Sequence, residues 1–421
     1  MQEAFIQFAW KMQVFTASTL TTTDGEPISI IYRGDWNTNS GPDFLHARIK
    51  IGDTLWVGNV EIHIKSSAWL AHKHHTDRTY DNVILHVVYE HDMPHSDIPT
   101  LALKPILPET LLHTYTHLMG SSNQVPCAHQ LNTVPPIYVH QCLDSMLAER
   151  LEEKATRIEQ RLHVQKNDWE ELTYQLIARG FGTNVNADPF ERVAMQLPYK
   201  LILKHHDQPF QIEALLFGQA GMLDGNFRAV YAHQLKAEYS FLKKKYGLEP
   251  IRALEWKFLR MRPANFPTIR MSQLAAFLSG RQKIFTHILD IRSVKEIRQL
   301  FQVEASPFWR EHYHFKRATK HAPGNIGDEF IHLQIVNTFA PLLFLYGKVH
   351  QQEAYITRAT DLLEQTPYER NHIVREWNDL GVNAQHAGHS QALLQLKQQY
   401  CVHKRCLECA IGYRILHSKR I

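Results

Sequence analysis

The sequence lacks the features that would place it in a membrane or outside the cell. Its longest apolar runs, such as APLLFLYG at 340–347, are far shorter than the roughly 20 residues that span a bilayer. The opening MQEAFIQFAWKMQVF does not have the basic–apolar–small order of an export signal. Five cysteines, an odd number, do not indicate a disulfide framework. We therefore expect a cytoplasmic protein with no membrane partner.

Nucleotide-binding motifs and repeats are missing as well. The glycine-containing stretches GFGTN and LFGQAG match neither a P-loop nor a dinucleotide-binding fingerprint, so we expect no nucleotide cofactor. The HExxH pattern of zinc hydrolases does not occur, and no fixed repeat period is visible. The formal net charge is only +4, so a nucleic-acid partner would require a local basic patch.

The 421 residues suggest two domains of different character. Apolar spacing predicts a helix at 3–14 and strands at about 43–51, 54–65, 82–91 and 100–104. Residues 1–105 therefore form an α/β (α+β) domain, in which the apolar segment 82–91 is a central strand. Residues 106–136, with several Pro and Ser residues, form a connector. Residues 137–421 have helical spacing throughout and predict a larger all-α domain.

The segment GPDFLHARIKIGDTLWVGNVEIHIK, residues 41–65, contains the first candidate site. Asp43 precedes Glu61 by 18 positions, and Glu61, His63 and Lys65 are spaced two apart, so a strand points them to one face. One interpretation is a solvated sheet face. The other is a metal site, because two carboxylates from adjacent strands provide the hard oxygen ligands that Mg²⁺ prefers.

The element order and the pair Pro42-Asp43 followed by Glu61 resemble the PD-(D/E)XK nuclease superfamily. This resemblance implies that Asp43 and Glu61 hold Mg²⁺, and that Glu3 in the first helix assists. It also implies a lysine two residues after the acid, but His63 stands there and Lys65 follows two later. We expect His63 or Lys65 to activate the attacking water.

The function implied by that resemblance is Mg²⁺-dependent hydrolysis of phosphodiester bonds in DNA or RNA. The alternative is a non-catalytic binding or scaffold protein that retains the fold. Most of the chain is also similar to an uncharacterised bacterial family with a domain of unknown function, through stretches such as NSGPDF, GNVEIH, NADPFERVA and RMRPANFPTIR. That second resemblance implies no activity.

A histidine-rich stretch follows the candidate strand. His72 and His75 are three apart, as on one helix face, and Asp77 lies two residues beyond. They are either supporting residues around the metal site, or residues on the wet side of a helix whose aromatic side chains pack on the sheet.

The cysteines contain the spacing Cys401-x4-Cys406-x2-Cys409, and Cys127 is a candidate fourth ligand. Such a set suits an iron–sulfur cluster or a Zn²⁺ site, with Cys142 as a spare. The alternative is buried cysteines without a ligand.

Basic and aromatic residues alternate between 254 and 273. Basic groups beside aromatic rings suit a nucleic-acid strand, whereas aromatic side chains in a core would leave only a basic helix end. The candidate contacts are Lys257, Arg260, Arg262 and Arg270.

Overall fold

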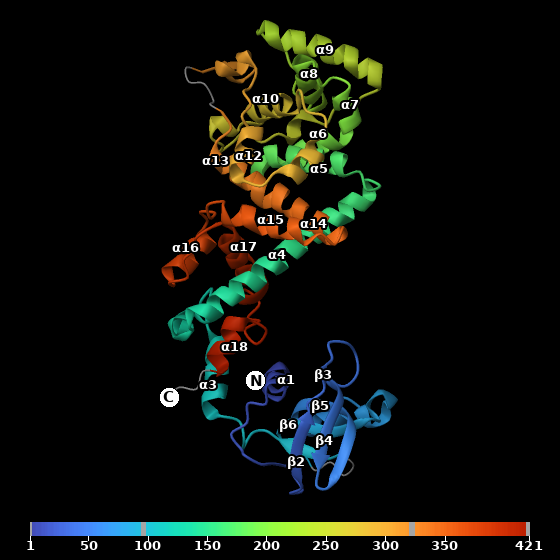
Figure 1. Cartoon of the computed structure of the whole chain (residues 1–421), viewed down its shortest axis with the longest axis vertical. Helices are drawn as coiled ribbons and strands as arrows, with labels where there is room; N and C mark the ends of the chain where they lie inside the picture. The colour runs from blue at the N-terminus through green and yellow to red at the C-terminus, as the bar shows by residue number, and fades with distance from the viewer. Residues whose placement is uncertain (1, 94–97, 320–324, 418–421) are drawn as a thin grey trace. The chain divides into compact units, whose positions relative to one another are not determined.

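The computed structural model describes residues 2–93, 98–319 and 325–417 of the chain. The chain divides into two compact units (Figure 1). We call Met1–Leu143 with Leu396–Ile421 the sheet unit, and Asp144–Gln395 the helical unit. The C-terminal segment thus groups with the sheet, whereas the sequence placed it in the all-α domain.

The sheet unit contains a seven-stranded mixed sheet in the order β1-β2-β4-β5-β6-β7, with β3 paired to β4. The strands are β1 (Leu20–Thr21), β2 (Pro27–Tyr32), β3 (Asp35–Trp36), β4 (Phe44–Ile51), β5 (Thr54–Lys65), β6 (Val83–Glu90) and β7 (Thr100–Ala102). β4 and β5 form an antiparallel hairpin, and β6 runs parallel to both β5 and β7. The predicted strands are therefore confirmed to within about two residues at each end.

Strand β6 is the buried centre of this sheet. Its residues from Val83 to Val88 are all buried, as the continuous apolar run predicted. Helix α1 (Glu3–Met12) contacts β5 and β6 with an apolar face that includes Phe5, Ile6 and Trp10. The polar residues Glu3 and Gln7 are one turn apart on the same helix.

The crossover from β5 to β6 is irregular. It contains one short helix, α2 (Ala68–Ala71), and two 3₁₀ turns, η1 (His74–Thr76) and η2 (Arg78–Tyr80). Lys73 has a left-handed backbone with φ of 61°, so the helix ends before the turn begins. This break changes the directions of the histidines that follow.

The predicted connector contains regular structure. Helix α3 (Glu109–Gly120) and the 3₁₀ helix η3 (Ala128–Thr133) both lie within residues 106–136. Both contact the C-terminal helix α18 (Ala410–His417) within the sheet unit. The π-helical segment η8 (Leu396–Cys401) precedes α18.

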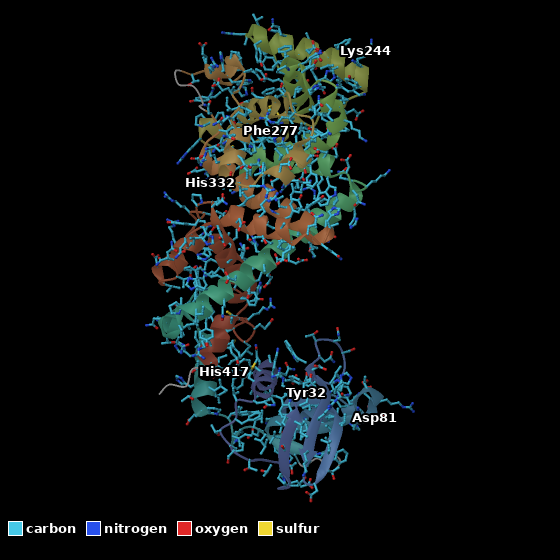
Figure 2. The ribbon with its side chains drawn as sticks, in the orientation of Figure 1. Tyr32, Asp81, Lys244, Phe277, His332 and His417 are labelled. Carbon is cyan, nitrogen blue, oxygen red and sulfur yellow. The ribbon has the colours of Figure 1, made fainter. Side chains whose placement is uncertain are left out.

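The helical unit buries a large aromatic and aliphatic core. Phe277, labelled in Figure 2, is fully buried and stacks on Phe301. Its helices are α4 (Pro136–Val164, which begins in the sheet unit), α5 (Trp169–Phe181), α6 (Thr183–Gln196), α7 (Tyr199–Leu203), α8 (Pro209–Gln219), α9 (Val230–Tyr246), α10 (Pro267–Leu278), α11 (Ile284–Asp290), α12 (Val294–Leu300), α13 (Asp328–Gln334), α14 (Ala340–Val349), α15 (Glu353–Glu364), α16 (His372–Asp379) and α17 (Ala387–Gln395). Short 3₁₀ helices η4 (Ala253–Glu255), η5 (Pro263–Asn265) and η6 (Pro307–Arg310), and the π-helix η7 (Ile335–Phe339), connect them.

The helical unit also contains a small hairpin of β8 (His312–His314) and β9 (Arg317–Ala318), which interrupts the helices. Among the described residues, one helical stretch, Asp328–Val349, is long and apolar enough to cross a membrane. In the fold, 72% of that stretch is buried, as in a core helix.

Candidate metal centre

The carboxylates of Asp43 and Glu61 meet where β4 begins beside β5. The backbone N–H of Asp43 donates to Oε2 of Glu61 over 3.2 Å, and the N–H of Ile62 donates to Oδ2 of Asp43 over 3.0 Å. Helix α1 contributes Gln7, whose side-chain amide donates to Oδ1 of Asp43 over 2.8 Å. One helix and two strands therefore position this acidic pair.

Two imidazoles, of His63 and His74, lie close to the other oxygen of Glu61, and a third, of His72, lies next to His63. His63 follows on the same strand face, and His72 and His74 come from the crossover. The ligand atoms of His63, His72 and His74 all lie within 4.8 Å of one another. Nε2 of His74 is buried without a hydrogen-bond partner among the described residues. These donors form a candidate metal centre.

The distances between these donors suit a single tetrahedral ion. Nε2 of His63 lies 3.1 Å from Nδ1 of His72 and 3.6 Å from Oε1 of Glu61, and that oxygen lies 3.4 Å from Nε2 of His74. Bonds of about 2.0–2.1 Å at tetrahedral angles separate ligands by about 3.3–3.4 Å. The three distances are close to this separation, and His63, His72 and His74 form the set whose ligand atoms all lie within 4.8 Å of one another, with Glu61 beside two of them.

Further side chains orient the imidazoles. The buried His86 of β6 lies next to Glu61 in the sheet, and its Nε2 is 2.9 Å from Nδ1 of His63. Ring contacts of Tyr80 and Trp69 hold His74, with centroids 3.8 Å and 5.3 Å away. A second hydrogen bond on a ligating imidazole fixes its tautomer and ring orientation, which is what His86 supplies to His63.

Burial makes negative charge unfavourable on the acidic residues. Burial first, and then the neighbouring Asp43, raise the pKa of Glu61 to about 9. Burial and then Glu3 raise the pKa of Asp43 to about 7, against the hydrogen bonds from Ile62 and Gln7. Burial also raises the pKa of Glu3, while His72 lowers it. These couplings show that Glu3 is close enough to Asp43 and His72 to influence their charges.

Burial favours the neutral forms of His63 and His74. It lowers the pKa of His63 to about 3, with further lowering by His86, His72 and His74. The pKa of His74 is lowered by burial and then by His72. Neutral imidazoles have the lone pairs that a metal requires, and a bound cation would compensate the buried carboxylates.

Lys65 does not join the centre, although it lies on the same strand. Its Nζ lies 3.8 Å from Oδ2 of Asp92, next to the loop after β6. Asp92 also accepts hydrogen bonds from Ser66 and Ser67, which draws this end of β5 away from the carboxylates. Of the two groups expected to activate water, only His63 is in place.

The histidine prediction requires a correction. His75 is exposed, and His74 takes the place we expected for it. The left-handed residue Lys73 breaks the helical spacing that paired His72 with His75. Asp77 caps η2 by accepting from the N–H of Thr79, and its charge raises the pKa of His74. Sequence reasoning also assigned no role to His86, whose proximity comes from strand pairing.

The proposed nucleic-acid contacts lie in the helical unit, and one requires a correction. Arg270 is 6% exposed, donates to Gln273 and Asn265, and packs over the ring of Phe330. It is a core residue. Trp256 is also buried and donates to the carbonyl of Ala220, so it offers no stacking surface. The side chains of Lys257, Arg260 and Arg262 are exposed.

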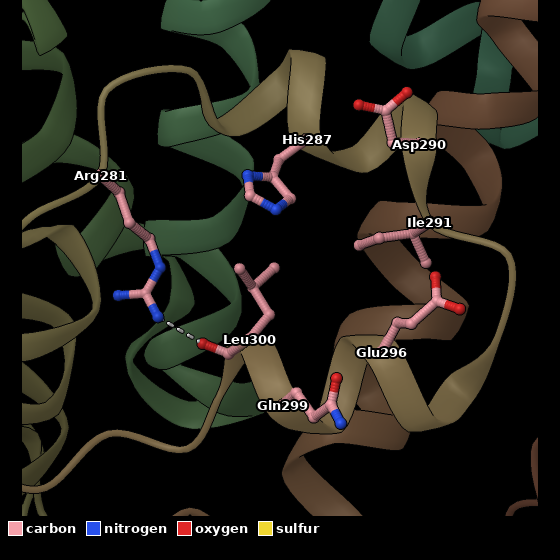
Figure 3. A pocket seen from close by; sticks show the side chains of 7 residues that line it. All are labelled: Arg281, His287, Asp290, Ile291, Glu296, Gln299 and Leu300. Carbon is pink, nitrogen blue, oxygen red and sulfur yellow. Dashed lines mark hydrogen bonds between the residues drawn. The ribbon is translucent and has the colours of Figure 1, made fainter.

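Two pockets of the helical unit do not involve the metal centre. Figure 3 shows one of about 380 Å³, where Arg281 donates to the carbonyl of Leu300 over 2.8 Å. The other, of about 760 Å³, is lined by basic residues. Its three arginines are paired with carboxylates, Arg157 with Glu153, Arg161 with Glu191, and Arg179 with Asp188 and Glu191. Neither pocket changes the assignment of the site.

Comparison with known protein families gives one match. The family model described as "Protein of unknown function (DUF2851)" matches residues 3–372. The chain belongs to this family. The match covers both the metal centre and most of the helical unit of this DUF2851 member, and the family description states no activity. Comparisons with curated proteins and with solved structures found no match.

Proposed function

We propose that this DUF2851 protein is a metal-dependent phosphodiesterase that cleaves DNA or RNA. The observation that carries the proposal is the convergence of Glu3, Asp43 and Glu61 with the three imidazoles of His63, His72 and His74. The element order α1, β2, β4, β5, α2, β6 supports it, because it agrees with the order expected for a PD-(D/E)XK nuclease.

Each residue has a definite part in this proposal. Glu61, His63, His72 and His74 hold a divalent transition ion, since imidazole ligands suit Zn²⁺ better than Mg²⁺. When bound, such an ion polarises a phosphoryl oxygen and lowers the pKa of bound water. The Asp43 side of Glu61 offers the oxygen ligands preferred by Mg²⁺, so two ions sharing Glu61 are part of the proposal.

Proton transfer falls to the acidic residues in this scheme. His63 is engaged on both ring nitrogens, by His86 and His72, so it positions the site instead of accepting a proton. Asp43 has a pKa near neutrality and lies beside Glu3. A group with such a pKa is well matched to accept a proton from water at neutral pH.

The test is hydrolysis of plasmid DNA, single-stranded DNA and RNA by the full-length protein with Mg²⁺, Mn²⁺ or Zn²⁺. We expect cleavage that is lost in Glu61→Gln and Asp43→Asn and kept in His75→Ala, whose exposed imidazole is the matched control. Equal cleavage by all variants would show a contaminating nuclease. Metal binding without cleavage of any substrate would favour the non-catalytic binding role.

A further inference from the structure

All five cysteines of the chain lie in the sheet unit, and none of them forms a disulfide bond. Each is free and buried. They come from four places: Cys127 caps η3, Cys142 lies in α4, Cys401 ends η8, and Cys406 and Cys409 precede α18. Helix α18 contacts η3, and this contact brings the segment of Cys406 and Cys409 near Cys127.

The thiols are close enough to influence one another. Burial, and to a smaller extent the neighbouring Cys409 and Cys406, raise the pKa of Cys127 to about 12. The pKa of Cys401 is raised by burial and then by Cys409, Cys127 and Cys406. Four thiols from both ends of the unit thus share one buried space. As thiolates they would repel one another without a cationic centre.

Cys409 is held as a thiolate would be. Its sulfur accepts hydrogen bonds from the thiol of Cys142 and from the backbone N–H groups of Gly412 and Ile411. Gly412 also lies against the turn that carries Cys406, because a Cβ there would lie 2.1 Å from the carbonyl oxygen of Cys406. Hydrogen bonds to sulfur are one of the features that tune iron–sulfur centres.

The spacing of the sulfurs argues against a single zinc ion. Zn–S bonds of about 2.3 Å place tetrahedral sulfurs about 3.8 Å apart. Among the described residues, the group of three or more ligand atoms within 4.8 Å of one another is the histidine set, not a cysteine set. A cluster of several irons holds its thiolates farther apart than one ion does, which agrees with neighbouring but separated sulfurs.

We propose that Cys127, Cys401, Cys406 and Cys409 hold an iron–sulfur cluster in the sheet unit. Cys142 is assigned as a hydrogen-bond donor and not as a ligand, because it forms a side-chain hydrogen bond with Cys409. Its thiol donates to the ligating sulfur of Cys409 and so acts as a positioning residue. This site is separate from the metal centre at Glu61 and does not rest on the proposed activity.

The test uses the full-length protein purified without oxygen. We expect a brown protein with iron and acid-labile sulfide in equal amounts. Cys127→Ser and Cys409→Ser should lose most of both, whereas Cys142→Ser should keep both and shift the reduction potential of the cluster. If the ligand variants fail to fold, wild-type protein stripped of iron and refilled with ferrous iron and sulfide gives the same answer through its visible absorption.

The contrary results are equally specific. Bound zinc without sulfide, or no metal after anaerobic purification and refilling, would overturn the cluster. Loss of iron in Cys142→Ser as complete as in Cys409→Ser would overturn the assignment of the ligands.

Discussion

At the scale of single residues, Glu61 connects the two halves of the proposed metal centre. Its Oε2 accepts from the backbone of Asp43, while its Oε1 lies 3.6 Å and 3.4 Å from nitrogens of His63 and His74. One carboxylate thus faces an acidic pair on one side and neutral imidazoles on the other. Substitution of this residue should affect metal binding, pH dependence and activity together.

The first prediction concerns His74. His74→Ala removes a nitrogen that has no other hydrogen-bond partner among the described residues, so Zn²⁺ affinity should fall at least about 10–100-fold, the loss seen for residues that only support a ligand. His75→Ala, one position along and exposed, should leave the affinity unchanged. Isothermal titration calorimetry measures both. Equal losses would indicate a general effect of the loop.

The second prediction concerns pH and metal-free protein. The folded state raises the pKa of Glu61 from 4.5 to about 9, so it favours the protonated form. The stabilisation from the protonated Glu61 is complete below pH 4.5, the pKa in the unfolded chain. It is lost as the pH rises to about 9, the pKa in the folded protein. Between these limits wild type should lose stability relative to Glu61→Gln by at most about 1.4 kcal/mol per pH unit. Urea unfolding at several pH values measures this, and parallel curves would contradict it.

Part of the site could be predicted from single residues. Asp43, Glu61 and His63 follow from strand alternation and from the chemistry of carboxylates beside an imidazole. His74 could not be predicted, because its direction depends on the left-handed backbone of Lys73, a lysine with no local signal for that conformation. Lys65, expected as one of two possible water-activating groups, instead has its Nζ 3.8 Å from Oδ2 of Asp92, which is distant in sequence.

At the scale of elements, the β4–β5 hairpin, strand β6 and helix α1 build the centre. Alternating and continuous apolar patterns made these elements predictable, since each pattern reports directly on burial. Helix α3 was not predicted, because it lies in a segment with turn-forming residues, whereas α18 lies in the region predicted to be helical. Their stability depends on packing against each other within the sheet unit.

The third prediction tests that packing. Gly412→Ala would place a Cβ 2.1 Å from the carbonyl oxygen of Cys406, so α18 must shift. Overpacking of this kind costs about 1–3 kcal/mol of unfolding free energy. Gly120→Ala, at the end of α3, is the control: an added Cβ there would meet no atom within 4 Å, so this change should be neutral or slightly stabilising. Unchanged stability in Gly412→Ala would contradict the close approach.

At the scale of the whole molecule, the chain consists of two units. The sheet unit contains the carboxylates and imidazoles of the candidate metal centre as well as the cysteines, and the helical unit contains a large core. The division near residue 140 could be read from composition. The return of the C-terminal segment to the sheet unit could not, because it depends on contacts between residues far apart in the sequence. Arg270 illustrates the same limit, since a basic residue in a basic stretch became a core residue.

The fourth prediction separates the two units. A ligand that binds only the folded state stabilises it by about 2.7 kcal/mol at a concentration 100 times its dissociation constant. Zn²⁺ should therefore slow amide hydrogen exchange around Glu61 to His74, while peptides of the helical unit such as α10 remain unchanged. Hydrogen-exchange mass spectrometry with and without a chelator measures this. Uniform protection of both units, or of neither, would contradict a metal site confined to the sheet unit.

The most direct test of the central claim is anomalous X-ray scattering from crystals of the full-length protein soaked in Zn²⁺ or Mn²⁺. We predict a metal peak within bonding distance of Oε1 of Glu61 and nitrogens of His63, His72 and His74, absent in Glu61→Gln crystals. A metal-soaked crystal without a peak at these four side chains would contradict the metal centre and the hydrolytic function proposed from it.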